Sequence, residues 1–280
     1  MIEDRSKILQ PRQVGVGVAG GAEAVIHDTR RYISQLPSGH AFIKLDFANA
    51  FNTLRRDLFL DTVARNTPEL YRFTLATYEC DPTLVYGSHT IPSREGPQQS
   101  DPLSSLEFCE SIQPILNELD SDLEIGFIDD LSMSSDLLKL AKDFETIIKA
   151  ETSTGLKLNT TKCEIIMDDF TILDFFPIFK DLIRVPKDKM TLLGAPILQG
   201  EALDEALQIK VDELQKAINR LKLLWTHDAL VHLKNIISIP KLLYLLRISN
   251  CYNHPLLLQF DIILKSGLST ILNVDFDETQ

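Results

Sequence analysis

LEIGFIDDLSMSS, residues 123–135, is typical of a β-hairpin, because two short apolar runs flank a tip that carries Asp129 and Asp130. AFIKLDF, residues 41–47, is typical of a strand whose side chains alternate between the two faces of a sheet and which ends near Asp46. If these segments are neighbours in one antiparallel sheet, three carboxylates from distant parts of the chain meet at one sheet edge.

The surrounding sequence predicts helices that cover this sheet. Helices are expected over residues 22–36 and 55–78, after Asp101-Pro102, and from Asp136 to a terminating Gly155. Short strands are also expected in LKLN (156–159), KCEIIM (162–167) and MTLLGAPI (190–197). From residue 203 onward the apolar residues recur at helical spacing, which predicts a separate helical layer, with inward positions at Leu203, Leu207, Val211, Leu214, Ile218, Leu221 and Trp225.

Composition places the chain among ordinary globular proteins. Of its 280 residues, 44% are hydrophobic and 24% are charged, which excludes collagen-like and disordered classes. Pro240, Lys241 and Asp261 interrupt the most apolar stretches, so no membrane span is expected. The four cysteines lie tens of residues apart, which matches neither a zinc knuckle nor a disulfide framework. With no apolar leader at the start, we expect an intracellular protein, nuclear or cytoplasmic.

Negative charge is concentrated in one segment. The chain carries 28 Lys and Arg against 40 Asp and Glu, a net charge of −12, and residues 41–134 alone contribute −10 of it. Proteins that grip nucleic-acid phosphates usually carry a basic surface, which this chain lacks overall. The acidic segment therefore either holds metal ions or is solvated surface.

The three converging carboxylates favour the metal interpretation on chemical grounds. Unpaired anions at one point raise one another's pKa, and Mg²⁺ removes that repulsion. Two such ions roughly 3.5–4 Å apart suit an in-line phosphoryl transfer. An Asp-Asp pair in a turn is also ordinary turn chemistry, so the pair alone leaves both interpretations open.

Five sequence blocks together are more specific than the pair. They are KLDFANAFN (44–52), EGPQQSDPLSS (95–105), GFIDD (126–130), GLKLNTTKCEI (155–165) and LLGAPI (192–197). In this order and spacing the chain resembles reverse transcriptase domains, RNA-directed DNA polymerases, of the non-LTR (LINE-type) retrotransposon kind. The resemblance implies an α+β reverse-transcriptase-like palm, an antiparallel sheet backed by helices. It also implies three regions: a remnant of fingers (1–39), a palm with the catalytic motifs (40–200) and a helical thumb-like or connection region (201–280).

The resemblance also implies roles for particular residues. Asp46, Asp129 and Asp130 would be the catalytic ligands of two Mg²⁺ ions, with Mn²⁺ as an alternative, and Lys162 would protonate the leaving pyrophosphate. The implied nucleotide-binding residues are Phe47, through its backbone carbonyl, and the side chains of Phe51 and Gln99, and the implied primer grip is Leu193-Gly194.

Each of these roles has a plainer alternative. Phe51 can be a core aromatic, Lys162 a solvated surface lysine, and Gly194 a residue that merely allows a bend. Asp101, inside the second block, is better explained as a helix cap than as a metal ligand.

The chain also departs from the family pattern. Ser100 stands where the family almost always has Gly, and Ser there would crowd the nucleotide. Of the fingers, only QVGVGVAGGAEAVIH (13–27) matches, without the Lys and Arg that hold the triphosphate. The expected partners are an RNA template, a DNA primer and dNTPs, but no membrane, with an upstream endonuclease and fingers region if the chain is a fragment.

Three functions remain open on the sequence. The first is an active reverse transcriptase domain of a retrotransposon. The second is a catalytically silent, retroelement-derived palm fragment with a structural or protein-interaction role, which the missing cations and Ser100 favour. The third is an RNA-directed RNA polymerase, which Phe51 disfavours because its ring would favour deoxynucleotides.

Overall fold

The protein is described by a computed structural model, and the structure describes residues 7–80, 83–99 and 101–276. Ser100, the predicted departure from the family pattern, lies outside the described residues. The chain divides into two compact units. Unit 1 comprises Met1–Val25 and Gln35–Pro186, and unit 2 comprises Ile26–Ser34 and Lys187–Gln280.

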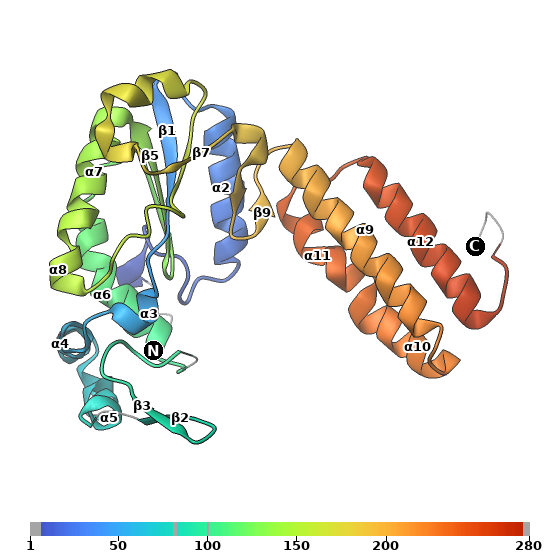
Figure 1. Cartoon of the computed structure of the whole chain (residues 1–280), viewed down its shortest axis with the longest axis horizontal. Coiled ribbons are helices and arrows are strands. Elements are labelled where there is room, and N and C mark those ends of the chain that lie inside the picture. Colours follow the sequence, from blue (N-terminus) through green and yellow to red (C-terminus); the bar gives the residue numbers. More distant parts are fainter. Residues whose placement is uncertain (1–6, 81–82, 100, 277–280) are drawn as a thin grey trace. The chain divides into compact units, whose positions relative to one another are not determined.

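Unit 1 is built on a five-stranded sheet with the order β4-β5-β1-β6-β7, of which β1, β5 and β7 are labelled in Figure 1. The strands are β1 (His40–Leu45), β4 (Leu123–Phe127), β5 (Asp130–Asp136), β6 (Glu164–Ile166) and β7 (Ile183–Val185). The pairs β4–β5, β5–β1 and β1–β6 are antiparallel, which confirms the predicted hairpin and its pairing with the 41–47 strand. The sheet is not purely antiparallel, however, because β7 runs parallel to β6.

Helices flank this sheet, and the first of them, α2 (Gly21–Ser34), begins in unit 1 and ends in unit 2. The remaining elements of unit 1 are α3 (Ala50–Thr53), α4 (Arg56–Asn66), α5 (Pro68–Tyr78), β2 (Thr83–Tyr86), β3 (His89–Pro92), α6 (Ser104–Glu118), α7 (Leu137–Lys149), α8 (Glu151–Thr154) and the 3₁₀ turns η1 (Phe170–Phe175) and η2 (Pro177–Phe179). Strands β2 and β3 form a small separate hairpin before α6.

Two sequence expectations for unit 1 are corrected. The single helix expected over residues 55–78 is two helices, because Thr67 precedes Pro68 and leaves the helical conformation (φ −134°). The strand expected at 156–159 is reduced to one isolated bridge between Phe47 and Leu158. Both differences arise from local geometry that hydrophobic spacing does not encode.

Two of the helix termini around the sheet follow the predicted capping chemistry, and a third does not. The carboxylate of Asp136 accepts hydrogen bonds from the backbone N–H groups of Leu138 and Lys139 at the start of α7. Gly155, in the left-handed conformation (φ 80°), ends α8. Asp101 does not cap α6, whose N-cap is Leu103 without a side-chain hydrogen bond; its carboxylate accepts from the backbone N–H of Leu103 at 2.8 Å, in the turn that precedes the helix.

The core of unit 1 lies between the sheet and helices α6 and α7 (Figure 1). Ala41, Ile43 and Leu45 of β1 face this core, so the intervening Lys44 projects from the opposite face of the sheet. The alternation predicted for residues 41–47 is therefore confirmed. It leaves the polar side chains of β1 available at the other face.

Unit 2 is mainly helical. Its elements are η3 (Lys187–Lys189), β8 (Thr191–Leu192), β9 (Ala195–Pro196), α9 (Glu201–Leu221), α10 (Thr226–His232), the π-helical turn η4 (Leu233–Ile237), α11 (Ile239–Ile248) and α12 (Pro255–Leu272). The predicted apolar stripe of α9 is buried from Leu203 to Leu221. Trp225 does not belong to it, because α9 has ended, and its side chain is 82% exposed.

The short hairpin β8–β9 belongs to unit 2. Tyr244 donates its hydroxyl to the carbonyl of Leu193 at 2.6 Å, and Ser249 donates to the carbonyl of Pro196 at 3.2 Å. Arg30 of the 26–34 segment donates to the carbonyl of Ile197 at 2.6 Å. This hairpin therefore belongs to the compact unit that begins again at Lys187.

Two helical segments among the described residues are long and apolar enough to cross a membrane. They are Thr226–Ile248 and Pro255–Leu272, each with a mean hydropathy of 1.3. This finding rests on length and composition only, and Pro240 and Lys241 lie within the first segment and Asp261 within the second.

Candidate functional site: a carboxylate pocket at the sheet edge

A pocket of about 350 Å³ lies where β1 ends and β5 begins. We call it the sheet-edge pocket. It is lined by Lys44, Leu45, Asp46, Asp130, Lys162, Glu164 and Ile183. Three of the four residues predicted to be catalytic, Asp46, Asp130 and Lys162, thus line one cavity.

Strand register brings the first two of these residues together. Leu45 of β1 pairs with Leu131 of β5, so the next position along β1, Asp46, lies beside Asp130. Phe127 pairs with Asp130 within the β4–β5 hairpin, which leaves a two-residue loop, Ile128-Asp129. Two carboxylates more than 80 residues apart therefore become cross-strand neighbours through the sheet pairing alone.

Electrostatics at the pocket are those of crowded like charges. Loss of water contact raises the pKa of the Asp130 carboxyl, although the residue as a whole is exposed, and the nearby charges of Asp129 and Asp46 raise this pKa further. Lys44 opposes that rise, but its ammonium group is already paired with Glu164 at 2.8 Å. The pocket therefore has a deficit of positive charge next to Asp130.

Asp129 is placed differently from the other two carboxylates. It is exposed at the hairpin tip and does not line the sheet-edge pocket. Its negative charge nevertheless helps to raise the pKa of the Asp130 carboxyl. The pKa of the Cys109 thiol in α6 is raised mainly by burial and further by the charge of Asp129. Asp129 is thus near enough to influence the pocket electrostatically.

The loop before β6 fixes the backbone of Asp46. The Asp46 carbonyl accepts a hydrogen bond from the backbone N–H of Asn159 at 2.8 Å, and its own N–H donates to the buried Cys163 Sγ at 3.4 Å. The N–H of Lys162 donates to the Asn159 carbonyl at 2.9 Å. One tight loop therefore positions both Asp46 and Lys162.

The predicted nucleotide-binding residues lie outside the sheet-edge pocket. The Phe47 side chain faces the apolar core, and the Phe51 ring stacks on Phe108 with centroids 4.9 Å apart and an interplanar angle of 22°. Gln99 is exposed in the loop before α6. Phe51 therefore packs against another aromatic ring, as expected if it is a core residue.

Arg56 holds the loop that leads to Gln99. Its guanidinium donates to the carbonyl oxygens of Ser93, Glu95 and Gly96 at 2.9, 3.3 and 3.2 Å. The guanidinium also lies over the ring of Tyr78, 5.1 Å from its centroid. This anchoring was not anticipated from the sequence.

The predicted primer-grip residues form the two-residue loop of the β8–β9 hairpin in unit 2. Leu193 and Gly194 both have positive φ, 48° and 74°, as a tight hairpin loop requires. The positive φ of Gly194 therefore supports the alternative that this glycine merely allows the chain to bend.

The donor set of the sheet-edge pocket suits a hard divalent cation only in part. Carboxylate oxygens are the ligands that Mg²⁺ prefers. The pKa of Asp130 is raised first by loss of water contact and then by the charges of Asp129 and Asp46, and a divalent ion would neutralise those charges. Within residues 7–80, 83–99 and 101–276, however, no group of three or more His, Cys, Asp and Glu side chains is arranged to hold a metal ion. Two carboxylates still suffice where substrate phosphates complete the coordination, as is usual for Mg²⁺.

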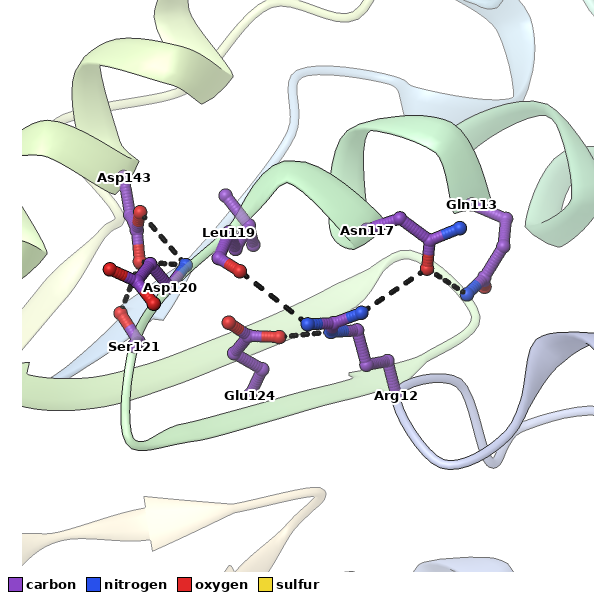
Figure 2. Close-up of polar contacts among 8 residues, drawn as sticks. All are labelled: Arg12, Gln113, Asn117, Leu119, Asp120, Ser121, Glu124 and Asp143. Atoms are coloured by element: carbon purple, nitrogen blue, oxygen red, sulfur yellow. Dashed lines mark hydrogen bonds and ion pairs between the residues drawn. The ribbon is translucent and has the colours of Figure 1, made fainter.

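Sequence reasoning missed the segment that fixes the other edge of the sheet. Arg12 bonds to Glu124 of β4 and also reaches the side chain of Asn117 at 3.3 Å and the carbonyl of Leu119 at 3.4 Å (Figure 2). The next residue, Gln13, is fully buried and forms a parallel bridge with Gly126 of β4. More than 100 residues separate these partners, so no local pattern could have revealed them.

A buried carboxylate supports the same region from the other side. Asp143 of α7 accepts hydrogen bonds from the backbone N–H of Asp120, at 3.1 Å to each oxygen, and from the Ser121 hydroxyl (Figure 2). It thereby fixes the turn between α6 and β4. The edge strand that leads to the acidic tip is held at its start by α7 and along its side by Arg12.

The fold and the pocket define an α+β protein with paired carboxylates at the edge of a mainly antiparallel sheet. Comparison with solved structures finds a telomerase from Candida albicans in complex with a TWJ fragment of telomeric RNA. That likeness has 11% identity and a TM-score of 0.48 and covers 98% of this chain and 52% of the other. An apo telomerase from Candida tropicalis, truncated from its C-terminal domain, has 12% identity, a TM-score of 0.39 and coverage of 58% and 39%.

Both TM-scores lie below 0.5, and a likeness at that level establishes neither a shared fold nor a shared function. The chain spans about half or less of the length of these two proteins. No family model and no curated protein matches the chain.

Proposed function

We propose that the chain is a reverse transcriptase domain of a retrotransposon, which transfers deoxynucleotides from dNTPs to the 3′-OH of a DNA primer on an RNA template. The observation that carries the proposal is the sheet pairing that sets Asp46 beside Asp130 in a pocket shared with Lys162. The five ordered sequence blocks support it independently, since three of them supply these three residues.

The proposal assigns each pocket residue a role. Asp46 and Asp130 would hold Mg²⁺ or Mn²⁺, with Asp129 as a further ligand at the tip. When bound, two such ions would supply activation of the primer hydroxyl and neutralisation of the charge that develops on the leaving group. Lys162 would hold a proton at Nζ near the leaving pyrophosphate, where a cation stabilises the transition state.

Other residues would act through shape. Phe51, fixed by its stacking on Phe108, would stand as a rigid wall that favours deoxynucleotides. Gln99 would contact the incoming nucleotide and the Phe47 carbonyl would lie beside the metal, while Leu193-Gly194 would contact the primer. We also propose that the protein acts inside the cell, which suits its four free cysteines.

A primer-extension assay with an RNA template, dNTPs and Mg²⁺ tests the proposal. Asp46→Asn and Asp130→Asn should lower extension at least about 100-fold, because each removes charge that stabilises the transition state. Asp61→Asn, at an exposed position of α4, is the matched control and should retain activity. Equal extension by the wild type and both pocket variants would refute the site, and replacing dNTPs with rNTPs tests the RNA polymerase alternative.

To the missing cations and Ser100, the structure adds one observation in favour of a catalytically silent palm fragment. The described side chains form no ready group of three metal ligands. Thermal denaturation with Mg²⁺ and with Mg²⁺ plus dNTP separates the two functions. A working nucleotide site predicts an additional dNTP-dependent rise in Tm, and a silent fragment predicts none.

A further inference from the structure

The loop that carries the acidic tip has an unusual backbone. Ile128 precedes Asp129-Asp130 and has φ 60°, in the left-handed region. A β-branched residue rarely adopts this conformation, because its Cβ crowds the neighbouring carbonyl oxygen. Surrounding structure must therefore hold Ile128 in place.

The side chain of Gln13 provides that hold. Its Oε1 accepts a hydrogen bond from the Ile128 N–H at 2.8 Å, and its Nε2 donates to the Ile128 carbonyl at 3.0 Å. Both backbone groups of the strained residue are thus satisfied by one side chain, and Gln13 is fully buried. A primary amide suits this task, because it offers one acceptor and one donor side by side.

The backbone around Gln13 fixes the position of its amide. The Gly126 N–H donates to the Arg12 carbonyl at 2.6 Å, and the Val14 N–H donates to the Gly126 carbonyl at 2.9 Å. The Gly15 N–H donates to Gln13 Oε1 at 3.1 Å. Residues 12–15, which we call the strap, therefore extend the sheet at β4 and orient the Gln13 side chain.

Two glycines allow the strap to approach this closely. A Cβ at Gly15 would lie 2.6 Å from the Ile128 backbone nitrogen, and a Cβ at Gly126 would lie 2.9 Å from Gln13 Nε2. Neither glycine is needed for a positive φ, because neither has one. Close contact between strap and turn explains both residues.

We infer that Gln13 is a positioning residue for the acidic tip, which sets the direction of Asp129 and Asp130 by holding both backbone groups of Ile128. The effect of Gln13 on catalysis rests on the proposed function, whereas its effect on the backbone of Ile128 does not. The neighbouring Arg12 does not share this role, since its contacts reach Glu124, Asn117 and Leu119 and not the turn.

The test compares Gln13→Met with Gln113→Met in the full chain. Gln113 is also a buried glutamine of unit 1, but its amide bonds to Asn117 within α6. Amide hydrogen exchange at Ile128, followed by NMR, should be at least about tenfold faster in Gln13→Met than in Gln113→Met. Gln13→Glu, which keeps the acceptor and loses the donor, should fall between Gln13→Met and the wild type.

Two further readouts separate positioning from general destabilisation. Titration with Mn²⁺ alone should give a Kd several-fold weaker for Gln13→Met than for Gln113→Met. Primer extension should show a lower kcat with a similar KM for dNTP.

Equal Ile128 exchange in the two methionine variants would overturn the inference, whatever the activity. Faster exchange and weaker Mn²⁺ binding, with no extension even by the wild type, would instead refute the proposed function and leave the positioning role supported.

Discussion

Two hairpins of this protein each hold a non-glycine residue in the left-handed conformation, and different contacts stabilise that conformation in each. The β4–β5 loop of unit 1 has Ile128 at φ 60°, and the β8–β9 loop of unit 2 has Leu193 at φ 48°. In both, a side chain from another segment bonds the carbonyl of that residue: Gln13 in the first and Tyr244 in the second. In the β4–β5 loop, Gln13 also accepts a hydrogen bond from the N–H of Ile128, whereas Tyr244 bonds only the Leu193 carbonyl.

The difference lies in what stabilises each turn. The second loop continues with Gly194, which adopts a positive φ without strain, and its supporting Tyr244 is 41% exposed. The first loop continues with Asp129 and is supported by a side chain with no exposure. With Asp129 in place of a glycine, the geometry of the first turn depends on a distant residue, Gln13.

The largest contrast is expected from adding one methyl group at Gly15 of the strap, against the first hairpin, and one at Gly194, within the second. Gly15→Ala should lower the free energy of unfolding of unit 1 by about 3 kcal/mol, because its Cβ would lie 2.6 Å from backbone rather than from a flexible side-chain end. Gly194→Ala should cost unit 2 only about 1 kcal/mol, since nothing lies within 4 Å of its Cβ and only the φ of 74° is unfavourable.

Hydrogen exchange followed by mass spectrometry measures these effects, because it reports on the peptides of each unit separately. Similar losses of protection at the two hairpins would contradict the idea that close packing, and not backbone conformation, dominates at the first.

The second contrast concerns buried charge in the two units. Unit 1 buries Glu107, which is 3% exposed and accepts a hydrogen bond from Thr74 at 3.0 Å, whereas unit 2 buries no charged residue among those that the structure describes. Burial raises the pKa of Glu107 from 4.5 to about 7, and the charges of Asp101 and Glu110 add to that rise.

The sign of the pH dependence follows from this raised pKa. Between pH 4.5 and about 7 the folded state holds a proton that the unfolded state has released, so the free energy of unfolding falls as pH rises. The loss is complete above about pH 7 and amounts to at most about 3 kcal/mol. Glu107→Gln should remove this slope from unit 1 and leave unit 2 unchanged.

Urea denaturation at several pH values between 4.5 and 8, read by the same exchange method, measures the slope. Glu118→Gln is the matched control on the same helix, because Glu118 is exposed, and it should keep the wild-type pH dependence. A slope that survives in Glu107→Gln would assign the pH dependence to other buried groups.

A smaller contrast comes from the two strained residues themselves. Asn tolerates the left-handed conformation, so Leu193→Asn should raise the free energy of unfolding of unit 2 by about 0.5–1 kcal/mol. Ile128→Asn should gain nothing, since Ile128 also packs against the core of unit 1 and loses that contact. Thermal unfolding of both variants checks this, and a clear stabilisation by Ile128→Asn would show that its packing is unimportant.

The smallest effect is expected at the supporting tyrosine. Tyr244→Phe removes the hydrogen bond to the Leu193 carbonyl, but water can replace it at this exposed site, so the cost should be about 0.5–1 kcal/mol. A loss of several kcal/mol, measured as a shift in Tm, would make the second hairpin as dependent on distant support as the first.

The sequence predicted the parts of unit 1 that depend on local pattern. The alternation of residues 41–47, the hairpin at 123–135 and the caps at Asp136 and Gly155 are all present. It did not predict the parallel strand β7, because apolar spacing does not encode the direction of pairing. The break at Thr67 also leaves that spacing unchanged, and its signal in the sequence is Pro68. For the helical layer, it extended the stripe to Trp225, one turn beyond the end of α9.

The candidate site divides in the same way. Asp46, Asp130 and Lys162 could be named from the sequence blocks, and the structure places them in one pocket. Arg56 and Cys163 could not be named, because they act through backbone atoms of residues far along the chain. The placement of Asp129 outside the pocket lining was also invisible to sequence reasoning, since neighbouring residues of a tight loop can point in different directions.

The sequence alone determined which residues could do chemistry and on which face of a strand each lies, because alternation and capping act over a few neighbouring residues. Tertiary structure decided which carboxylates share a pocket and what holds them there. Gln13 reaches Ile128 across 115 positions of chain, and only the close packing of strap against hairpin brings that amide to the turn.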